Sequence, residues 1–201
     1  MSDVDLSIVV CFYNMQREAP RSLFALSRAY QQGIEGLNYE VIAVDNGSSS
    51  PLSNNLVSSF GPEFRYRFHP TKACSPVEAI HQAICTSRGK HVMVMVDGAH
   101  ICTPRVLSRA MQSFELDPNA FFATVAMHLG PANQSISINE GYSQVMEDAL
   151  LAQSNWEQDG YRLFTIAGSF ADNSGGWFGC LWESNCFALS KHRYLQSGGL
   201  D

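Results

Sequence analysis

Three uninterrupted apolar runs, each followed by a polar segment, constrain the fold of this chain most. They span Leu6–Tyr13, Tyr39–Val44 and Val92–Val96. Short runs of β-branched and aromatic residues are typical of strands that are buried on both faces of a parallel sheet. Apolar residues at helical spacing fill the intervals, as between Pro76 and Gly89. This alternation predicts an α/β fold with a mostly parallel central sheet flanked by helices.

Ser or Thr followed by Pro predicts three of the helix starts, because the hydroxyl caps the first turn and proline fits its first position. The pairs are Ser50-Pro51, Ser75-Pro76 and Thr103-Pro104. Glu78 stands three residues after Ser75, which predicts a capping box. Elsewhere the pattern predicts a helix over Ile138–Gln153 and strands over Arg65–Phe68, Phe121–His128, Tyr161–Ile166 and Phe187–Leu189.

The composition fits one globular domain, since 45% of the 201 residues are hydrophobic and 16% are charged. The net charge of −6 lacks the basic footprint of a nucleic-acid binder, so no nucleic-acid partner is expected. No apolar run approaches the ~20 residues of a membrane span, and the acidic start lacks the features of a secretory signal. We therefore expect a cytoplasmic protein without a transmembrane segment, whose cysteines are reduced core thiols: Cys11, Cys74, Cys85, Cys102, Cys180 and Cys186.

Ligands of open α/β sheets bind outside the carboxyl ends of the strands, where Asn14–Arg17, Asp45–Ser50 and Asp97–Thr103 fall. No glycine-rich dinucleotide or phosphate loop follows the first run. Asp45 and Asp97 each end a buried run, and a carboxylate there can accept hydrogen bonds from a nucleoside or hold a divalent cation. Asp45 can equally cap its own loop through the backbone.

The sequence resembles the family 2 glycosyltransferases. The resemblance rests on four segments in order: LSIVVCFYN, YEVIAVDNGSSS, GKHVMVMVDGAHICTP and ESNCFALSKHRYLQSGGLD. It implies a GT-A-type, Rossmann-like single domain, with a nucleotide-binding half at 1–103 and an acceptor-side half at 104–201. It further implies that the domain takes a nucleoside diphosphate sugar and transfers the sugar with inversion to an acceptor, which can be a glycan, a lipid or a protein.

The resemblance also implies which residues bind the nucleotide: Tyr13, Asn14, Asp45, Lys72 and Asp97. Asp97 takes the first position of the family's D-x-D metal motif, but Ala99 replaces the second carboxylate. His100 can supply the missing ligand for Mn²⁺ or Mg²⁺, or can be a solvated loop histidine. The arginine that often meets the diphosphate is absent, and Lys72 or Arg88 can replace it.

On the acceptor side, Trp177 and Trp182 are candidates to stack on an acceptor sugar, although either can also simply pack. Asn185 lies in the fourth matched segment and can contact the acceptor or be an ordinary polar loop residue. The resemblance implies a catalytic base in an acidic pair just beyond the G-G-[FL]-D-E segment, which places it at Asp201 or beyond residue 201. Glu183 is the internal carboxylate of the matched acceptor region that can take this role instead.

Three classes of function remain open from the sequence. The first is the sugar transferase that the resemblance implies. The second is a nucleotidyltransferase of similar layout, although Arg17 is the one arginine in the loop after the first run. The third is a non-catalytic or degenerate nucleotide-sugar-binding domain, which Ala99 and Ile80 both favour.

Overall fold

The computed structural model describes residues 3–168, 179–181 and 184–200. Its contacts divide the chain into two compact units. The first unit comprises Met1–Ala123 together with Asn185–Asp201, and the second comprises Thr124–Ser184. The sequence predicted a boundary between the two halves at residues 103 and 104. In the structure the first boundary follows Ala123, and the last segment of the chain, from Asn185, belongs to the first unit again.

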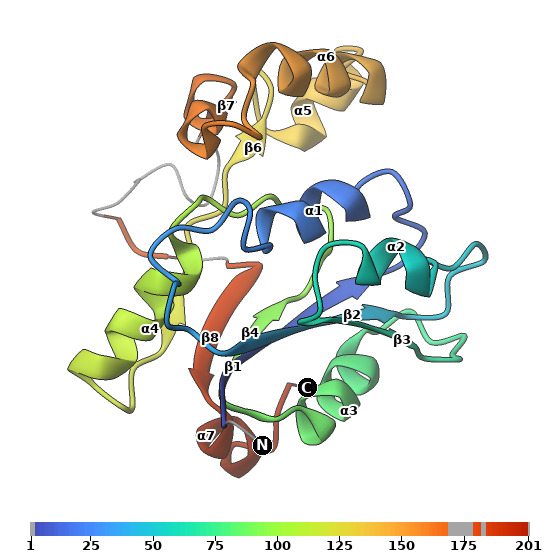
Figure 1. Ribbon diagram of the computed structural model, residues 1–201. Coiled ribbons are helices and arrows are strands. Elements are labelled where there is room, and N and C mark those ends of the chain that lie inside the picture. Colours follow the sequence, from blue (N-terminus) through green and yellow to red (C-terminus); the bar gives the residue numbers. More distant parts are fainter. Residues whose placement is uncertain (1–2, 169–178, 182–183, 201) are drawn as a thin grey trace. The chain divides into compact units, whose positions relative to one another are not determined.

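The first unit contains a six-stranded sheet in the order β3-β2-β1-β4-β8-β5 (Figure 1). Neighbours among β1 to β4 pair in parallel, and β8 runs antiparallel to both β4 and β5. This arrangement confirms the predicted α/β fold with a mostly parallel central sheet. The strands are β1 (Val4–Phe12), β2 (Tyr39–Asp45), β3 (Phe64–Phe68), β4 (Gly89–Met95), β5 (Phe122–Ala123) and β8 (Cys186–Ser190).

The residues of β2 and nearly all of β1 are buried, because helices cover both faces of this sheet. Figure 1 shows α3 and α7 on one side and α1 and α2 on the other. On the first side Ile80 and Ile84 of α3 pack with Val9 and Val94. The helices of this unit are α1 (Ala19–Ala25), α2 (Asn54–Ser58), α3 (Val77–Thr86), α4 (Val106–Leu116) and α7 (Lys191–Gln196).

Two predicted helix starts are wrong. Helix α2 begins at Asn54, where the Ser53 side chain accepts a hydrogen bond from the backbone N–H of Leu56. Helix α4 begins at Val106 without a side-chain cap. Pro51 therefore lies in an irregular segment before α2, and Pro104 lies in a turn before α4.

The start of α3 lies where it was predicted, next to Pro76, but its capping differs. Ser75 Oγ accepts a hydrogen bond from the N–H of Val77 at 3.3 Å. The Glu78 carboxylate accepts one from the Gln82 side chain at 3.0 Å. Glu78 thus faces along the helix to the next turn, instead of reaching back to Ser75.

The second unit holds a two-stranded antiparallel sheet of β6 (His128–Leu129) and β7 (Ala167–Gly168). The predicted helix over residues 138–153 is divided into α5 (Gln134–Asn139) and α6 (Gln144–Ser154), because Gly141 between them has a φ of 92°. The predicted strand over residues 161–166 is wrong. A 3₁₀-helix, η1 (Gly160–Thr165), forms there, and the Asp159 side chain caps it at Tyr161 N–H.

The cysteine prediction holds in part. All six thiols are free, and Cys11, Cys102 and Cys186 are buried as expected. The remaining three, Cys74, Cys85 and Cys180, are exposed. Among the described residues no helix is long and apolar enough to cross a membrane.

Candidate functional site

The loops that follow β1, β2 and β4 meet at the carboxyl edge of the sheet, because these three strands are parallel neighbours. The backbone N–H of Asn14 after β1 donates to Ser48 Oγ after β2 at 2.8 Å. Ser22 of α1 donates a hydrogen bond to the carbonyl oxygen of Gly98 after β4. The loops after β1 and β2 are therefore joined directly, and the loop after β4 is tied to α1, the helix that follows the loop after β1.

Asp45 ends β2 and is completely buried. Its Oδ1 accepts the backbone N–H of Ser48 and its Oδ2 accepts that of Leu52, both at 2.9 Å. In this arrangement the carboxylate holds its own loop in place. Its predicted contact with a nucleoside stays a prediction.

Asn46 follows Asp45 and was not singled out from the sequence. Its side chain is 4% exposed, and its Nδ2 donates a long hydrogen bond of 3.4 Å to the Ser75 carbonyl. Its Oδ1 is buried and has no hydrogen-bond partner among the residues that the structure describes. A buried carbonyl oxygen without a donor is costly, so this atom is a candidate acceptor for a ligand N–H.

Asn14 has a φ of 53°, in the left-handed region that few residues other than glycine and asparagine adopt. Its Oδ1 accepts hydrogen bonds from both the backbone N–H and the hydroxyl of Ser49, each at 2.9 Å. Tyr13 beside it is 57% exposed. The turn after β1 is thus fixed, while its tyrosine ring faces solvent.

Asp97 follows β4, and its side chain is 45% exposed. Its Oδ1 accepts the N–H of Ala99 at 2.8 Å, and among the described residues no hydrogen bond to its Oδ2 is found. His100 Nδ1 lies 3.0 Å from the Asp97 carbonyl oxygen, and His100 Nε2 lies 3.1 Å from Asn185 Nδ2. Both ring nitrogens of His100 are therefore engaged in contacts with neighbouring groups.

The residues at this loop do not fit a divalent cation held by the protein. Asp97 offers one open oxygen, Ala99 offers none, and both ring nitrogens of His100 already make hydrogen bonds. No group of three or more His, Cys, Asp or Glu side chains within the described ranges is arranged as a metal site. The structure therefore brings the predicted metal residues together without giving them a free set of ligands.

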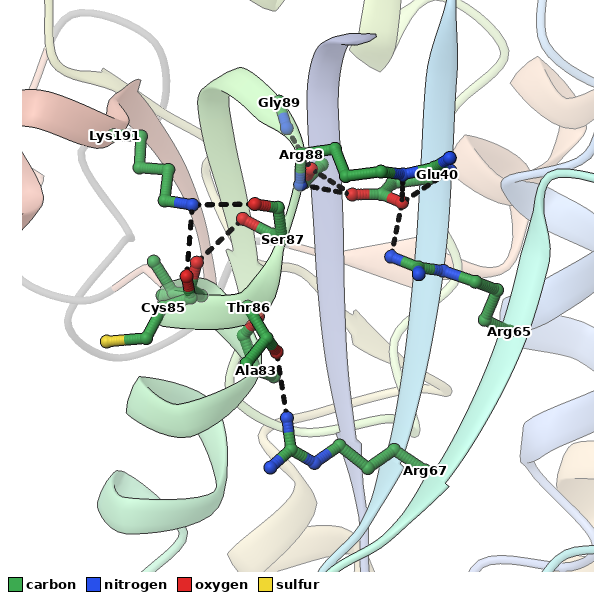
Figure 2. A network of polar contacts seen from close by, with 12 residues as sticks. Glu40, Arg65, Arg67, Ala83, Cys85, Thr86, Ser87, Arg88, Gly89 and Lys191 are labelled. Carbon is green, nitrogen blue, oxygen red and sulfur yellow. Dashed lines mark hydrogen bonds and ion pairs between the residues drawn. The ribbon is translucent and has the colours of Figure 1, made fainter. Parts of the chain in front are cut away.

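Lys72 is exposed in the loop between β3 and α3. This loop reaches the site, because a Cβ at Gly47 would lie 2.3 Å from the carbonyl oxygen of neighbouring Thr71. Arg88, the other candidate for the diphosphate, precedes β4 at the opposite edge of the sheet and pairs with Glu40 (Figure 2). The alternative that Arg88 meets the diphosphate is therefore wrong.

Asn185 is the one predicted acceptor-side residue that the structure describes, and it contacts the Asp97 loop through His100. Its carbonyl oxygen also accepts the N–H of Val96 at 3.1 Å. The other predicted residues lie outside the described residues: Trp177, Trp182, Glu183 and Asp201.

A family model described as glycosyl transferase family 2 matches residues 7–178. No curated protein matches the chain. Similar solved structures include the mannosyltransferase PcManGT from Pyrobaculum calidifontis in complex with GDP-Man and Mn²⁺, with a TM-score of 0.55 at 16% identity. That comparison covers 98% of this chain and 47% of the mannosyltransferase.

TarS from S. aureus, residues 1–349 in complex with UDP-GlcNAc, gives a TM-score of 0.51 at 18% identity and covers 59% of this chain and 33% of that one. Across the similar structures the chain spans from 21% to 60% of their length. At these identities the likeness establishes the fold, which is the GT-A type.

Proposed function

Because the chain belongs to glycosyl transferase family 2, we propose that it binds a nucleoside diphosphate sugar and transfers the sugar to an acceptor hydroxyl with inversion. The observation that carries this proposal is the buried Asn46 carbonyl oxygen, which lacks a donor among the described residues. A ring N–H of a nucleobase is the donor that it needs. Uracil and guanine both offer one, and the two similar structures hold UDP-GlcNAc and GDP-Man.

The remaining roles follow from where the side chains lie. Tyr13 offers an exposed ring against which a nucleobase can stack, and the open Oδ2 of Asp97 can accept a ribose or sugar hydroxyl. Lys72 is an exposed cation that can approach the diphosphate. Asp45 acts indirectly, because it holds the loop that carries Asn46.

The proposed transfer is a single displacement. A general base removes the proton from the acceptor hydroxyl, whose oxygen attacks the anomeric carbon on the face opposite the diphosphate. The bond from that carbon to the phosphate oxygen breaks, and its electron pair leaves with the nucleoside diphosphate. Such a base must lie within hydrogen-bond reach of the hydroxyl, and Glu183 and Asp201 remain the predicted candidates.

Titration calorimetry with UDP and GDP tests the nucleobase contact. Asn46→Ala is expected to weaken the preferred nucleotide about 5- to 150-fold, the equivalent of one lost hydrogen bond of about 1–3 kcal/mol in a buried site. Asn55→Ala, on the exposed face of α2, is the matched control and is expected to bind as the wild type does. Equal affinities for the two variants would show that Asn46 does not meet the base.

A second function, a non-catalytic donor-binding domain, is favoured by the Asp97 loop, where Ala99 replaces a carboxylate and both His100 nitrogens are engaged. Chromatography of a reaction with a nucleotide-sugar and a panel of glycan, lipid and peptide acceptors separates the classes. Release of nucleoside diphosphate with a glycosylated product supports the transferase. Binding without product supports the second function, and release of pyrophosphate would indicate a nucleotidyltransferase.

A further inference from the structure

His69 is a buried histidine at the candidate site that the proposed function does not use. It follows β3 directly and is 9% exposed. Its backbone N–H donates to the Asp45 carbonyl oxygen at 2.8 Å, but no hydrogen bond of its imidazole ring is found among the described residues. Buried polar groups normally have a hydrogen-bond partner, so this ring is a candidate to contact a ligand.

The pairing of β2 with β3 places His69 beside Asn46. The parallel register sets Asp45 opposite Phe68, and the hydrogen bond from His69 N–H to the Asp45 carbonyl oxygen continues this ladder by one residue. Neighbouring strands lie about 5 Å apart, and residues that stand opposite each other point to the same face of the sheet. The side chains of Asn46 and His69 are therefore lateral neighbours.

Both side chains lie on the face of the sheet that α3 covers, because residues two apart in a strand share a face. Val44, two residues before Asn46, belongs to one apolar cluster with the buried residues of α3. Arg67, two residues before His69, donates a hydrogen bond to Thr86 Oγ1 at the end of α3 at 2.9 Å (Figure 2). Two buried polar side chains thus stand side by side on the α3 face, at the carboxyl edge of the sheet.

The Ser75 carbonyl group sets the orientation of the Asn46 amide. Asn46 Nδ2 donates to this carbonyl oxygen at 3.4 Å, and Oδ1 is the atom that lacks a donor among the described residues. If the amide were turned over, two carbonyl oxygens would face each other. An imidazole carries at least one N–H donor in each of its forms. Asn46 and His69 therefore offer a ligand an acceptor next to a donor.

The edge of a nucleobase that complements this pair has an N–H next to a carbonyl group. Uracil and guanine have this edge, whereas cytosine and adenine have a ring nitrogen acceptor next to an amino group. We propose that His69 is a specificity-determining residue that donates to the base carbonyl while Asn46 accepts the neighbouring N–H. The site thus takes uracil or guanine and rejects cytosine and adenine. This inference rests on the proposed function, because it requires that the base of the donor bind at Asn46.

Titration calorimetry on the wild-type protein tests the selection with UDP against CDP and GDP against ADP, because each pair shares a ring system and differs in this edge. The better ligand of UDP and GDP should bind at least about 10-fold more tightly than its amino counterpart, whose edge leaves the buried groups of the site unpaired. The chosen pair also tells uracil from guanine.

A thio analogue of the preferred nucleotide, 4-thio-UDP or 6-thio-GDP, tests the contact with His69 separately from the contact with Asn46. It keeps the N–H and replaces the carbonyl oxygen by sulfur, which is a weaker acceptor. The wild type should bind it about 3- to 10-fold more weakly than the oxygen nucleotide, the usual effect of one weakened hydrogen bond.

His69→Phe keeps a flat ring and removes the N–H. This variant should bind the preferred nucleotide about 3- to 10-fold more weakly and should no longer distinguish it from the thio analogue. A purely structural role of the ring would not abolish that distinction. His69→Gln, whose amide can donate, should restore part of it. His192→Phe, at an exposed position of α7, is the matched control and should behave as the wild type does.

The wild-type series decides the matter even if His69→Phe folds poorly. Equal binding of the oxygen and sulfur nucleotides to the wild type would overturn the role of His69, and so would a difference that persists in His69→Phe. Equal binding of UDP and CDP, together with equal binding of GDP and ADP, would overturn the base selection and leave the proposed function standing. A wild type that binds none of the four nucleotides would instead refute the proposed function, and this inference with it.

Discussion

Glu40→Gln is expected to destabilise the first unit strongly, although Glu40 lies near the start of β2 and the candidate site lies beyond its end at Asp45. Figure 2 shows the polar contacts of the Glu40 carboxylate. The Glu40 carboxylate is completely buried. It accepts a hydrogen bond from Ser7 Oγ at 2.6 Å, one from Arg88 N–H at 2.7 Å and one from Arg88 Nε at 2.8 Å. It also pairs with the guanidinium of Arg65. One side chain thus joins β1, β2, β3 and the start of β4.

The size of the loss follows from how exposed the partners are. Removal of one member of a fully buried ion pair costs about 3–5 kcal/mol, because the other charge stays uncompensated. Here the side chains of Arg65 and Arg88 are 44% and 55% exposed, so water can solvate them once the carboxylate is gone. We therefore expect a loss of about 2–3 kcal/mol, which corresponds to a melting point lower by roughly 5–10 °C in a chain of this size.

The assay is guanidinium denaturation followed by far-UV circular dichroism, which reports on the helices and strands of the chain, including those of the first unit. Tryptophan fluorescence would report on the other unit, because Trp156, Trp177 and Trp182 all lie between residues 124 and 184. Glu78→Gln is the matched control: Glu78 is an exposed acid on α3 whose carboxylate accepts from Gln82. Its effect should stay below about 1 kcal/mol, the usual limit for a surface charge near a helix end.

The pH dependence of the same difference gives an independent check. Burial raises the pKa of Glu40, but the hydrogen bonds from Ser7 and Arg88 and the charge of Arg65 outweigh it, so its pKa lies below the ordinary 4.5. A lowered pKa means that the stabilisation is fully present above about pH 4.5 and is lost as the pH falls through the folded-state pKa. The gap between wild type and Glu40→Gln should therefore narrow in acid. A midpoint for Glu40→Gln within error of the wild type at pH 7 would refute this account.

Three further changes test other parts of the first unit. Burial lowers the pKa of His91 below 6.5, so NMR titration should find its imidazole neutral at pH 7. The wild type should then lose stability as the pH falls below 6.5, and in His91→Phe this pH-dependent loss should be absent. Gly47→Ala should lower the melting point by several degrees, because Gly47 has a φ of 75° and a Cβ would lie 2.3 Å from the Thr71 carbonyl oxygen. Gly98→Ala should do the same in thermal denaturation, since a Cβ would lie 2.2 Å from the ring of Phe12.

The sequence by itself determined the strands of the parallel sheet. Tyr39–Val44 is apolar at nearly every position, and a strand buried on both faces requires that composition whatever its neighbours are. The polar residues after such strands likewise had to lie at the carboxyl edge, since parallel strands end together. This is why the loops after Asn14, Asp45 and Asp97 were found to meet.

The local sequence signals failed where the same residue types are compatible with more than one kind of secondary structure. Tyr161–Ile166 has the apolar content of a strand, yet an Asp159 cap starts a 3₁₀-helix there. The Thr103-Pro104 pair has the chemistry of a helix start, yet α4 begins only at Val106. In both cases propensity over a few residues was overruled by the neighbouring chain, which fixes the backbone direction.

Only the tertiary structure decided which polar groups are occupied and which are free. Arg88 and Lys72 are both cations in the sequence, but Arg88 is held by buried Glu40 at the far edge, while Lys72 is exposed near the site. Asn46 and Asp45 are adjacent, yet it is the Asn46 oxygen that is left without a donor among the described residues. Asn185 meets the Asp97 loop through His100, because the strand that follows it, β8, returns antiparallel beside β4. Each of these contacts joins residues distant in the chain, and composition and spacing carry no information about which distant groups a fold brings together.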